Sequence, residues 1–256
     1  MLFRSDMGSF RIRDRKQLAN VIFPIFDKYP LLTTKYFNYA KFKKAHIILE
    51  DSTLTKSEKN ARIEALLLTK PDQFYISPAF LTFAKEESKN NSLPLPSIGC
   101  NSGRQIQLRP LGMDATDAKK IISKSWLIGF VEAEGSFYLV KKDSNRIVHG
   151  FGITQKLDGI VLEGIRHILH ISTKVVYKNK YNHYMIDTTN SRAIQNIIEY
   201  FSASRPNIMK GMKAVEFRIW SRSFNKHKGD YSELEKVQKI LRKLRKIRAD
   251  NTLWNS

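Results

Sequence analysis

The spacing of apolar side chains predicts three helices in the first part of the chain. Apolar residues recur at helical intervals over residues 14–26 and 34–49, and Pro30 separates the two segments. A third helix is predicted over residues 56–68. In front of them, residues 10–13 alternate apolar with basic side chains, which is typical of a short strand. We therefore expect a strand followed by three helices.

The second half of the chain alternates between helical and extended patterns. Between residues 116 and 226 the order is a helix, two strands, a helix, two strands and two further helices. The last three helices are expected at residues 159–170, 191–201 and 213–224. This αββαββα order predicts an α+β fold in which a four-stranded antiparallel sheet carries helices on one face. Residues 86–115 are rich in Ser, Asn, Pro and Gly, so we expect a linker there.

A basic amphipathic helix is predicted over residues 231–248. Leu234, Val237, Leu241 and Leu244 follow each other at intervals of three or four, and lysines and arginines surround them. The pattern has two interpretations, a surface helix docked through its leucine face and a nucleic-acid-binding arm. The docked helix is favoured, because a run of charges is usually a solvated face.

An excess of positive charge indicates a polyanionic partner. The 256 residues contain 44 Lys and Arg against 24 Asp and Glu, which gives a net charge of +20. A membrane surface is the weaker alternative, and no apolar run approaches the ~20 residues that a membrane-spanning helix needs. Cys100 is the single cysteine of the sequence, which excludes an internal disulfide and a zinc site built on cysteines.

Two carboxylates at the end of an apolar helix are the most informative local feature. The run from Trp126 to Val131 is apolar, and Glu132 and Glu134 follow it before Gly135 breaks the helix. The C-terminal end of a helix is its negative pole, and two neighbouring acids raise each other's proton affinity. Because a cation relieves both effects, the pattern indicates a divalent metal.

The same residues resemble a known motif. Residues 127–135 read L-I-G-F-V-E-A-E-G, which resembles the LAGLIDADG motif of homing endonucleases and intron-encoded RNA maturases. Ser136, Phe137 and Tyr138 then open a strand, and residues 150–156 resemble the family's second strand with its glutamine. The resemblance implies the LAGLIDADG homing-endonuclease fold, in which the αββαββα repeat forms a saddle-shaped antiparallel sheet.

Two segments of the first part recur in the second. Residues 14–22 match 190–198, and residues 35–42 match 213–220, at offsets of 176 and 178 positions. Near-constant offsets indicate a duplication. The first copy then lacks its acidic helix and the strands that follow it, because they would precede Met1. Either these elements lie upstream in a longer reading frame, or the first copy is truncated.

The repeat divides the chain into four parts. We expect residues 1–85 to be a truncated first LAGLIDADG repeat, 86–115 a linker, 116–226 a complete second repeat and 227–256 a basic C-terminal helix and tail. The arginines near the N-terminus resemble those of a mitochondrial transit peptide, but two aspartates and the repeat itself argue against that interpretation.

The resemblance implies a metal-dependent active site at the end of the acidic helix. By position in the motif, Glu134 ligates the metal with the carbonyl of Ala133 beside it, and Glu132 caps or orients. In the family two such helices pack closely through small residues, which are Gly129 and Ala133 here. The implied reaction is hydrolysis of a phosphodiester on each DNA strand, in which Mg²⁺ activates water and neutralises the leaving oxygen.

Three further residues match catalytic residues of the family. Lys213 corresponds to its active-site lysine, and Lys35 is the counterpart in the first copy; a lysine there stabilises charge on the scissile phosphate. Gln155 matches the polar residue that positions water. Without the repeat, these residues would be read as two surface lysines and a glutamine at a strand edge.

The sheet is expected to bind the DNA duplex. Residues 136–142 alternate so that Ser136, Tyr138 and Lys142 share one face, and Arg146 lies across the following turn. A β-ribbon fits the major groove, so these four residues are predicted DNA contacts. Most other basic residues are expected to meet phosphates and to make the affinity salt-dependent.

The resemblance leaves three functions open. The first is an intron-encoded homing endonuclease on double-stranded DNA, which needs a second acidic helix from a homodimer or from a missing N-terminal half. The second is an RNA maturase that assists splicing of its host group I intron RNA without catalysis, and the third is a decayed reading frame. The combination of Glu134, Gln155 and Lys213 favours the endonuclease. The chain looks most like fungal mitochondrial members, which implies the mitochondrial matrix.

Overall fold

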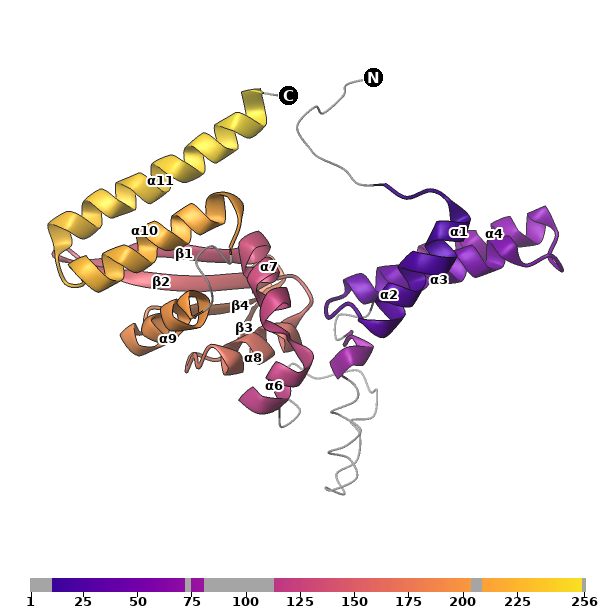
Figure 1. Cartoon of the computed structure of the whole chain (residues 1–256), viewed down its shortest axis with the longest axis horizontal. Coiled ribbons are helices and arrows are strands. Elements are labelled where there is room, and N and C mark those ends of the chain that lie inside the picture. The colour runs from indigo at the N-terminus through magenta and orange to yellow at the C-terminus, as the bar shows by residue number, and fades with distance from the viewer. Residues whose placement is uncertain (1–10, 72–74, 81–112, 204–208, 255–256) are drawn as a thin grey trace.

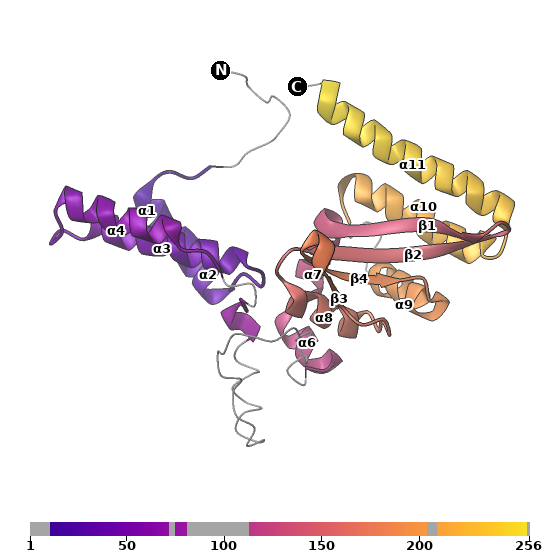
Figure 2. The same ribbon diagram turned by 180° about the vertical axis from the view of Figure 1, so that it is seen from behind.

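The computed structural model describes residues 11–71, 75–80, 113–203 and 209–254 (Figure 1). The described N-terminal part is helical, whereas the second half is built around a sheet. Figure 2 shows the same arrangement from behind. None of the described helices is long and apolar enough to cross a membrane.

The sheet has four antiparallel strands in the order β1-β2-β4-β3. Helix α7 (Lys124–Glu134) leads directly into β1 (Gly135–Asp143) and β2 (Arg146–Gln155). Helix α8 (Gly159–Ile168) connects them to β3 (Val176–Lys178) and β4 (His183–Thr188), and α9 (Ser191–Ser202) and α10 (Gly211–His227) follow. The predicted α+β fold with its four-stranded antiparallel sheet is confirmed.

Alternate side chains of the strands face the helices and form the core. In β1, Phe137 and Leu139 are buried, while Ser136 and Tyr138 are half-buried on the opposite face. Trp220 of α10 is fully buried beside Phe137, with ring centroids 5.0 Å apart, and its indole Nε1 donates to the carbonyl oxygen of Tyr138 at 3.0 Å. These contacts fix α10 on the helix-bearing face of the sheet.

His149 of β2 is a buried base in this core. Its Nε2 lies 2.8 Å from Ser223 Oγ, and its ring packs edge-on against Phe224. Burial, assisted by the charge of Lys228, lowers the pKa of His149 to about 4. The folded chain therefore holds His149 neutral at pH values where the unfolded chain protonates it.

The burial of His149 makes the free energy of unfolding pH-dependent. Because the unfolded state binds the extra proton, the free energy of unfolding falls as the pH is lowered from the ordinary histidine pKa towards the depressed one. We expect His149 to account for a loss of about 3 kcal/mol across this window. Urea unfolding at a series of pH values checks this, and His149→Gln is expected to flatten the curve. A variant as acid-sensitive as wild type would contradict the assignment.

The described N-terminal part consists of packed helices. Helix α1 (Arg15–Gln17), the π-helical turn η1 (Leu18–Ile22) and α2 (Phe23–Lys28) form one continuous segment, followed by α3 (Lys35–Glu50) and α4 (Lys56–Leu68). The three predicted helices are confirmed. Pro24 has no N–H to donate to the preceding turn, which is consistent with the π-helical turn in front of it.

The strand predicted at residues 10–13 is wrong for residues 11–13, which have no regular secondary structure; Phe10 lies outside the described residues. A strand needs a neighbour to satisfy its backbone hydrogen bonds. No strand of the described chain pairs with this segment, because the four strands pair only with one another. Local alternation of apolar and basic side chains does not supply such a neighbour.

The N-terminal helices leave large apolar side chains exposed. Val21, Ile25, Phe42 and Ile47 are 47–59% exposed in the described structure. In the second half, α9 and α10 instead bury residues such as Ile197 in the core beside the sheet. Apolar exposure of this extent is typical of a surface that another element covers.

Two further helices accompany the sheet. Helix α6 (Ala115–Ile121), capped by Asp114, is an addition to the predicted elements, and the linker expected at 86–115 lies outside the described residues up to residue 112. Helix α11 (Tyr231–Trp254) packs on α10 and on β1 and β2, with Leu234 and Leu241 buried. The docked-helix interpretation of the basic tail is confirmed.

Candidate active site

Helix α7 has two different faces. Leu127 and Val131 are completely buried in the core. Gly129, Ala133 and Glu134 are exposed on the other face, and a Cβ added at Gly129 would meet no atom of the described chain within 4 Å outside its own stretch of helix. The motif therefore places small side chains and one carboxylate on an open helix surface.

Gly135 connects α7 to β1 without a loop. Its backbone N–H donates to the carbonyl oxygen of Val131. A Cβ at position 135 would lie 2.6 Å from that same oxygen, which is closer than real Cβ atoms approach. Glycine is thus required here for a steric reason. The junction holds Glu134, the last helical residue, at the beginning of the sheet.

The two carboxylates at the end of α7 have different surroundings. Glu132 Oε1 accepts a hydrogen bond from the backbone N–H of Lys210, the N-cap position of α10. An anionic acceptor stabilises the N-terminus of a helix, so Glu132 has the expected capping role. Glu134 is exposed and has no hydrogen-bond or ion-pair partner among the described residues.

A pocket of about 540 Å³ opens beside the exposed face of α7. Glu134 and Ala133 line it together with Gln155, from the end of β2, and Lys35, from the first turn of α3. Gly129 also lines it. Three of the four predicted catalytic residues thus share one pocket, although Lys35 is distant in the sequence.

Lys213, the fourth predicted catalytic residue, reaches the same helix–strand junction without lining the pocket. Its Nζ donates to the carbonyl oxygen of Gly135 at 2.8 Å and lies 3.6 Å from Glu216 Oε2. The Lys213 side chain is only 11% exposed. Its cationic group therefore sits against the backbone of the residue that follows Glu134.

The donors at this end of α7 are oxygen atoms. The carboxylate of Glu134, the carbonyl of Ala133 and the amide oxygen of Gln155 suit a hard divalent cation such as Mg²⁺ better than zinc. Among the described residues no group of three or more His, Cys, Asp and Glu side chains is placed to hold a metal ion. A cation here would need further oxygen ligands from phosphate, water or a second acid.

Asp158 links the N-terminal helices to this pocket. Its carboxylate accepts from the backbone N–H of Thr34 at 2.7 Å and from Thr34 Oγ1 at 3.3 Å. Burial raises the pKa of Asp158, and the hydrogen bonds from Thr34 and the charge of Lys35 oppose that rise. Thr34 is the N-cap residue of α3, so Asp158 holds the helix that begins with Lys35. The sequence carries no signal for this contact, because Asp158 precedes α8 and would be read as its cap.

Removing the Asp158 carboxylate is expected to loosen the start of α3. Asp158→Ala leaves the Thr34 N–H without its acceptor, at a cost of about 1–3 kcal/mol. Hydrogen exchange of a peptide covering Thr34 should accelerate by roughly tenfold or more. Asp158→Asn is the matched control, because it keeps an acceptor oxygen and should preserve slow exchange. Unchanged exchange in Asp158→Ala would show that apolar packing alone holds α3.

The predicted DNA-contact residues lie at or beside the open face of the sheet. Lys142 and Arg146 are exposed on either side of the β1–β2 turn, and Ser136 is half-buried. The Tyr138 hydroxyl instead donates to Asp187 Oδ1. A Cβ at position 150 would lie 2.2 Å from the Tyr138 ring, so this ring occupies the space that a side chain at Gly150 would need. DNA contact by all four residues stays a prediction, and the Tyr138 hydroxyl is engaged by Asp187 in this structure.

A protein-family model described as LAGLIDADG endonuclease matches residues 3–46 and 127–224, which is more than half of the chain. The chain belongs to the LAGLIDADG endonuclease family. The family resemblance inferred from residues 127–135 is therefore confirmed. The residues that the family model matches include Lys35, Glu134, Gln155 and Lys213.

Two curated relatives of this LAGLIDADG protein are probable intron-encoded endonucleases. Cox1-I1b of Schizosaccharomyces pombe is 35% identical over 239 residues, covering 92% of this chain and 52% of that protein. The aI3 protein of Kluyveromyces lactis is 24% identical over 217 residues, covering 82% of this chain and 48% of that protein. The chain thus spans about half the length of these relatives.

Solved structures of LAGLIDADG homing endonucleases share the fold. I-SmaMI bound to cleaved DNA aligns with a TM-score of 0.59 and 22% identity, over 88% of this chain and 71% of that one. I-LtrWI bound to target DNA aligns with a TM-score of 0.57 and 20% identity, over 90% and 72%.

Proposed function

We propose that this LAGLIDADG protein is an intron-encoded, site-specific endonuclease that hydrolyses phosphodiester bonds of double-stranded DNA with Mg²⁺. One observation carries the proposal: Glu134, the Ala133 carbonyl, Gln155 and Lys35 line a single pocket at the exposed end of α7. Both curated relatives are named as probable intron-encoded endonucleases, and I-SmaMI has been captured on uncleaved DNA in the presence of calcium ions.

In this mechanism each residue of the pocket has one task. Glu134 and the Ala133 carbonyl would hold the divalent cation, which when bound would supply activation of water and neutralisation of charge on the leaving oxygen. Gln155 orients the attacking water through its amide. Lys35, and Lys213 at the adjoining junction, stabilise negative charge that develops on the scissile phosphate.

The proposed reaction needs a second acidic helix. The described chain brings one α7-type helix to the pocket, and each strand of the duplex requires its own acid. The open face of Gly129 and Ala133 is suited to close packing of a second helix, because small residues let helix backbones approach. A second copy of the chain or an upstream segment would provide that helix, and the exposed apolar side chains of α2 and α3 fit such an addition.

An RNA-maturase role is the less favoured alternative. It requires a basic surface but no acid in a pocket, whereas Glu134 is exposed without a partner in the described structure. The names of the relatives also favour the nuclease. The Cox1 name of the S. pombe relative supports a mitochondrial origin, and we place the protein in the matrix on that basis.

Cleavage of DNA spanning the intron-insertion site tests the proposal. This chain is compared with a version extended upstream by at least about 50 residues, the shortfall that the repeat offset implies. Mg²⁺-dependent cleavage by both forms would mean that the chain dimerises, and cleavage by the longer form alone would assign the second acid to the upstream segment. Absence of cleavage by either form would overturn the proposal and favour the splicing role.

A further inference from the structure

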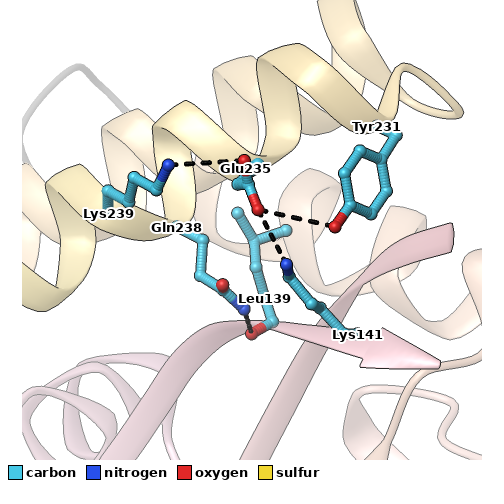
Figure 3. Close-up of polar contacts among 6 residues, drawn as sticks. All are labelled: Leu139, Lys141, Tyr231, Glu235, Gln238 and Lys239. Carbon is cyan, nitrogen blue, oxygen red and sulfur yellow. Dashed lines mark hydrogen bonds and ion pairs between the residues drawn. The ribbon is translucent and has the colours of Figure 1, made fainter. Parts of the chain in front are cut away.

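Helix α11 is bound to the exposed edge of the sheet by polar side chains. β1 is an edge strand, so one side of its backbone has no neighbouring strand. Gln238 Nε2 of α11 donates to the carbonyl oxygen of Leu139 at 2.8 Å, and Glu235 pairs with Lys141 at 2.7 Å (Figure 3). Arg245 donates to the carbonyl oxygen of Phe137. These bonds cover an edge that would otherwise be open to pairing with another strand.

Arg245, whose side chain is 37% exposed, also pairs with a buried carboxylate beside the candidate active site. Its Nη2 lies 3.4 Å from Glu216 Oε2, and Lys213 Nζ lies 3.6 Å from the same oxygen. Glu216 is 2% exposed, and both cations offset the cost of burying its carboxylate. Lys213 in turn donates to the carbonyl oxygen of Gly135 at 2.8 Å. A chain of contacts therefore runs from α11 to the residue that follows Glu134.

We infer that Arg245 is a positioning residue for Lys213, and that α11 thereby belongs to the active-site machinery. The inference rests on the proposed function in one respect, the role of Lys213 at the scissile phosphate. Nothing in the family match anticipates it, because that match ends at residue 224 and α11 begins at Tyr231.

The physical reason is competition for one carboxylate oxygen. Arg245 balances part of the Glu216 charge, which leaves Lys213 able to bond to the Gly135 carbonyl at a shorter distance than to Glu216. Without Arg245, Lys213 would face a less balanced carboxylate in surroundings of low dielectric constant, where attraction between opposite charges is strong. Lys213 would then move towards Glu216 and away from the helix–strand junction.

Acylation of the Lys213 amine in the purified full chain tests this positioning. The rate is measured at one fixed pH by mass spectrometry of the peptide that contains Lys213. Arg245→Met should slow it roughly three- to tenfold, because the loss of one cation and the closer carboxylate both hold the amine proton more tightly. Glu216→Gln should accelerate it, and the double variant Arg245→Met/Glu216→Gln should return it to about the wild-type rate.

Two controls distinguish an effect of Arg245 on the position of Lys213 from two other effects: the loss of a positive charge in general, and the loss of its bond to the Phe137 carbonyl. Arg242→Met removes the same charge from the exposed side of α11 and should leave the Lys213 rate unchanged. Arg245→Lys retains a cation and should stay closer to wild type than Arg245→Met; it also serves if Arg245→Met does not fold. If Arg245 only protected the Phe137 carbonyl, Glu216→Gln would not restore the rate, and that result would overturn the inference. An unchanged or faster rate in Arg245→Met would overturn it as well.

The acylation result does not depend on DNA cleavage. In any form of the protein that cleaves, Arg245→Met should lower kcat by a larger factor than it changes KM. Arg242→Met should change both constants much less than Arg245→Met changes kcat. If no form cleaves, the proposed function fails, while the Lys213 rates still decide whether Arg245 positions that lysine.

Discussion

Glu134→Gln is expected to abolish DNA cleavage while leaving DNA affinity and folding intact. The substitution keeps the size of the side chain and removes the negative charge that would hold a divalent cation. A bound metal contributes several kcal/mol of transition-state stabilisation, and each 1.36 kcal/mol is a factor of ten in rate, so the loss should reach about a thousandfold or more. Single-turnover cleavage of the target duplex in Mg²⁺ measures it, with binding followed in Ca²⁺.

Glu132→Gln provides a matched control two residues earlier in the same helix. It removes the same charge, but its amide oxygen can still accept from the Lys210 N–H. Cleavage should therefore stay within about tenfold of wild type. The two variants should rank in the opposite order in thermal stability. Glu134→Gln removes a negative charge from the negative end of α7 and should raise Tm slightly, whereas Glu132→Gln weakens the cap of α10 and should lower it. Cleavage that persists in Glu134→Gln would refute the site assignment.

Local patterns predicted most of the helices and strands of this fold. Helix α4 matches its predicted bounds of 56–68, because Thr55 and Glu58 form a capping box at its start. The alternation of β1 likewise predicted that Ser136 and Tyr138 lie on the same face, since successive side chains of a strand point to opposite faces. Each of these signals lies within about ten residues of the structure it specifies.

Contacts between distant residues could not be predicted from the residue pattern. Asp158 binds Thr34 from 124 positions away, and Tyr138 binds Asp187 across the sheet. From the sequence alone, an aspartate or a tyrosine that caps a helix looks the same as one that binds a distant residue or one that is solvated. The strand expected at residues 10–13 failed for the same reason, because pairing depends on a partner that a local pattern does not contain.

The candidate site was predictable only through the motif. Glu134 could be identified from its position at the end of an apolar helix, but Lys35, Gln155 and Lys213 are unremarkable residues in their own segments. The resemblance supplied their association, and the structure gathers Lys35 and Gln155 around Glu134 in one pocket. The role inferred for Arg245 could not be predicted even from the motif. Arg245 lies outside the residues that the family model matches, and it is inferred to act through the buried Glu216.

Gly129→Leu is expected to stabilise the isolated chain and to abolish cleavage. Outside its own stretch of helix, no atom of the described chain lies within 4 Å of a Cβ at this position, so a side chain can begin here without a clash. Leucine also favours a helix over glycine by roughly 0.8–1 kcal/mol, which should raise Tm by about 2–4 °C. A leucine on this face would nevertheless hold a second acidic helix away, because close helix packing requires small residues at the contact.

Gly129→Ala provides a graded comparison, since one methyl group gains helix propensity with little added bulk. Tm should rise in both variants, whereas association, followed by sedimentation, and cleavage should decline from glycine to alanine to leucine. A folding defect would lower both stability and cleavage. A rise in stability together with a loss of cleavage would instead indicate a clash with the second helix. If Gly129→Leu instead cleaves as well as wild type, the open face of α7 does not pack against a second helix in the active protein, and the second acid must reach the pocket by another route.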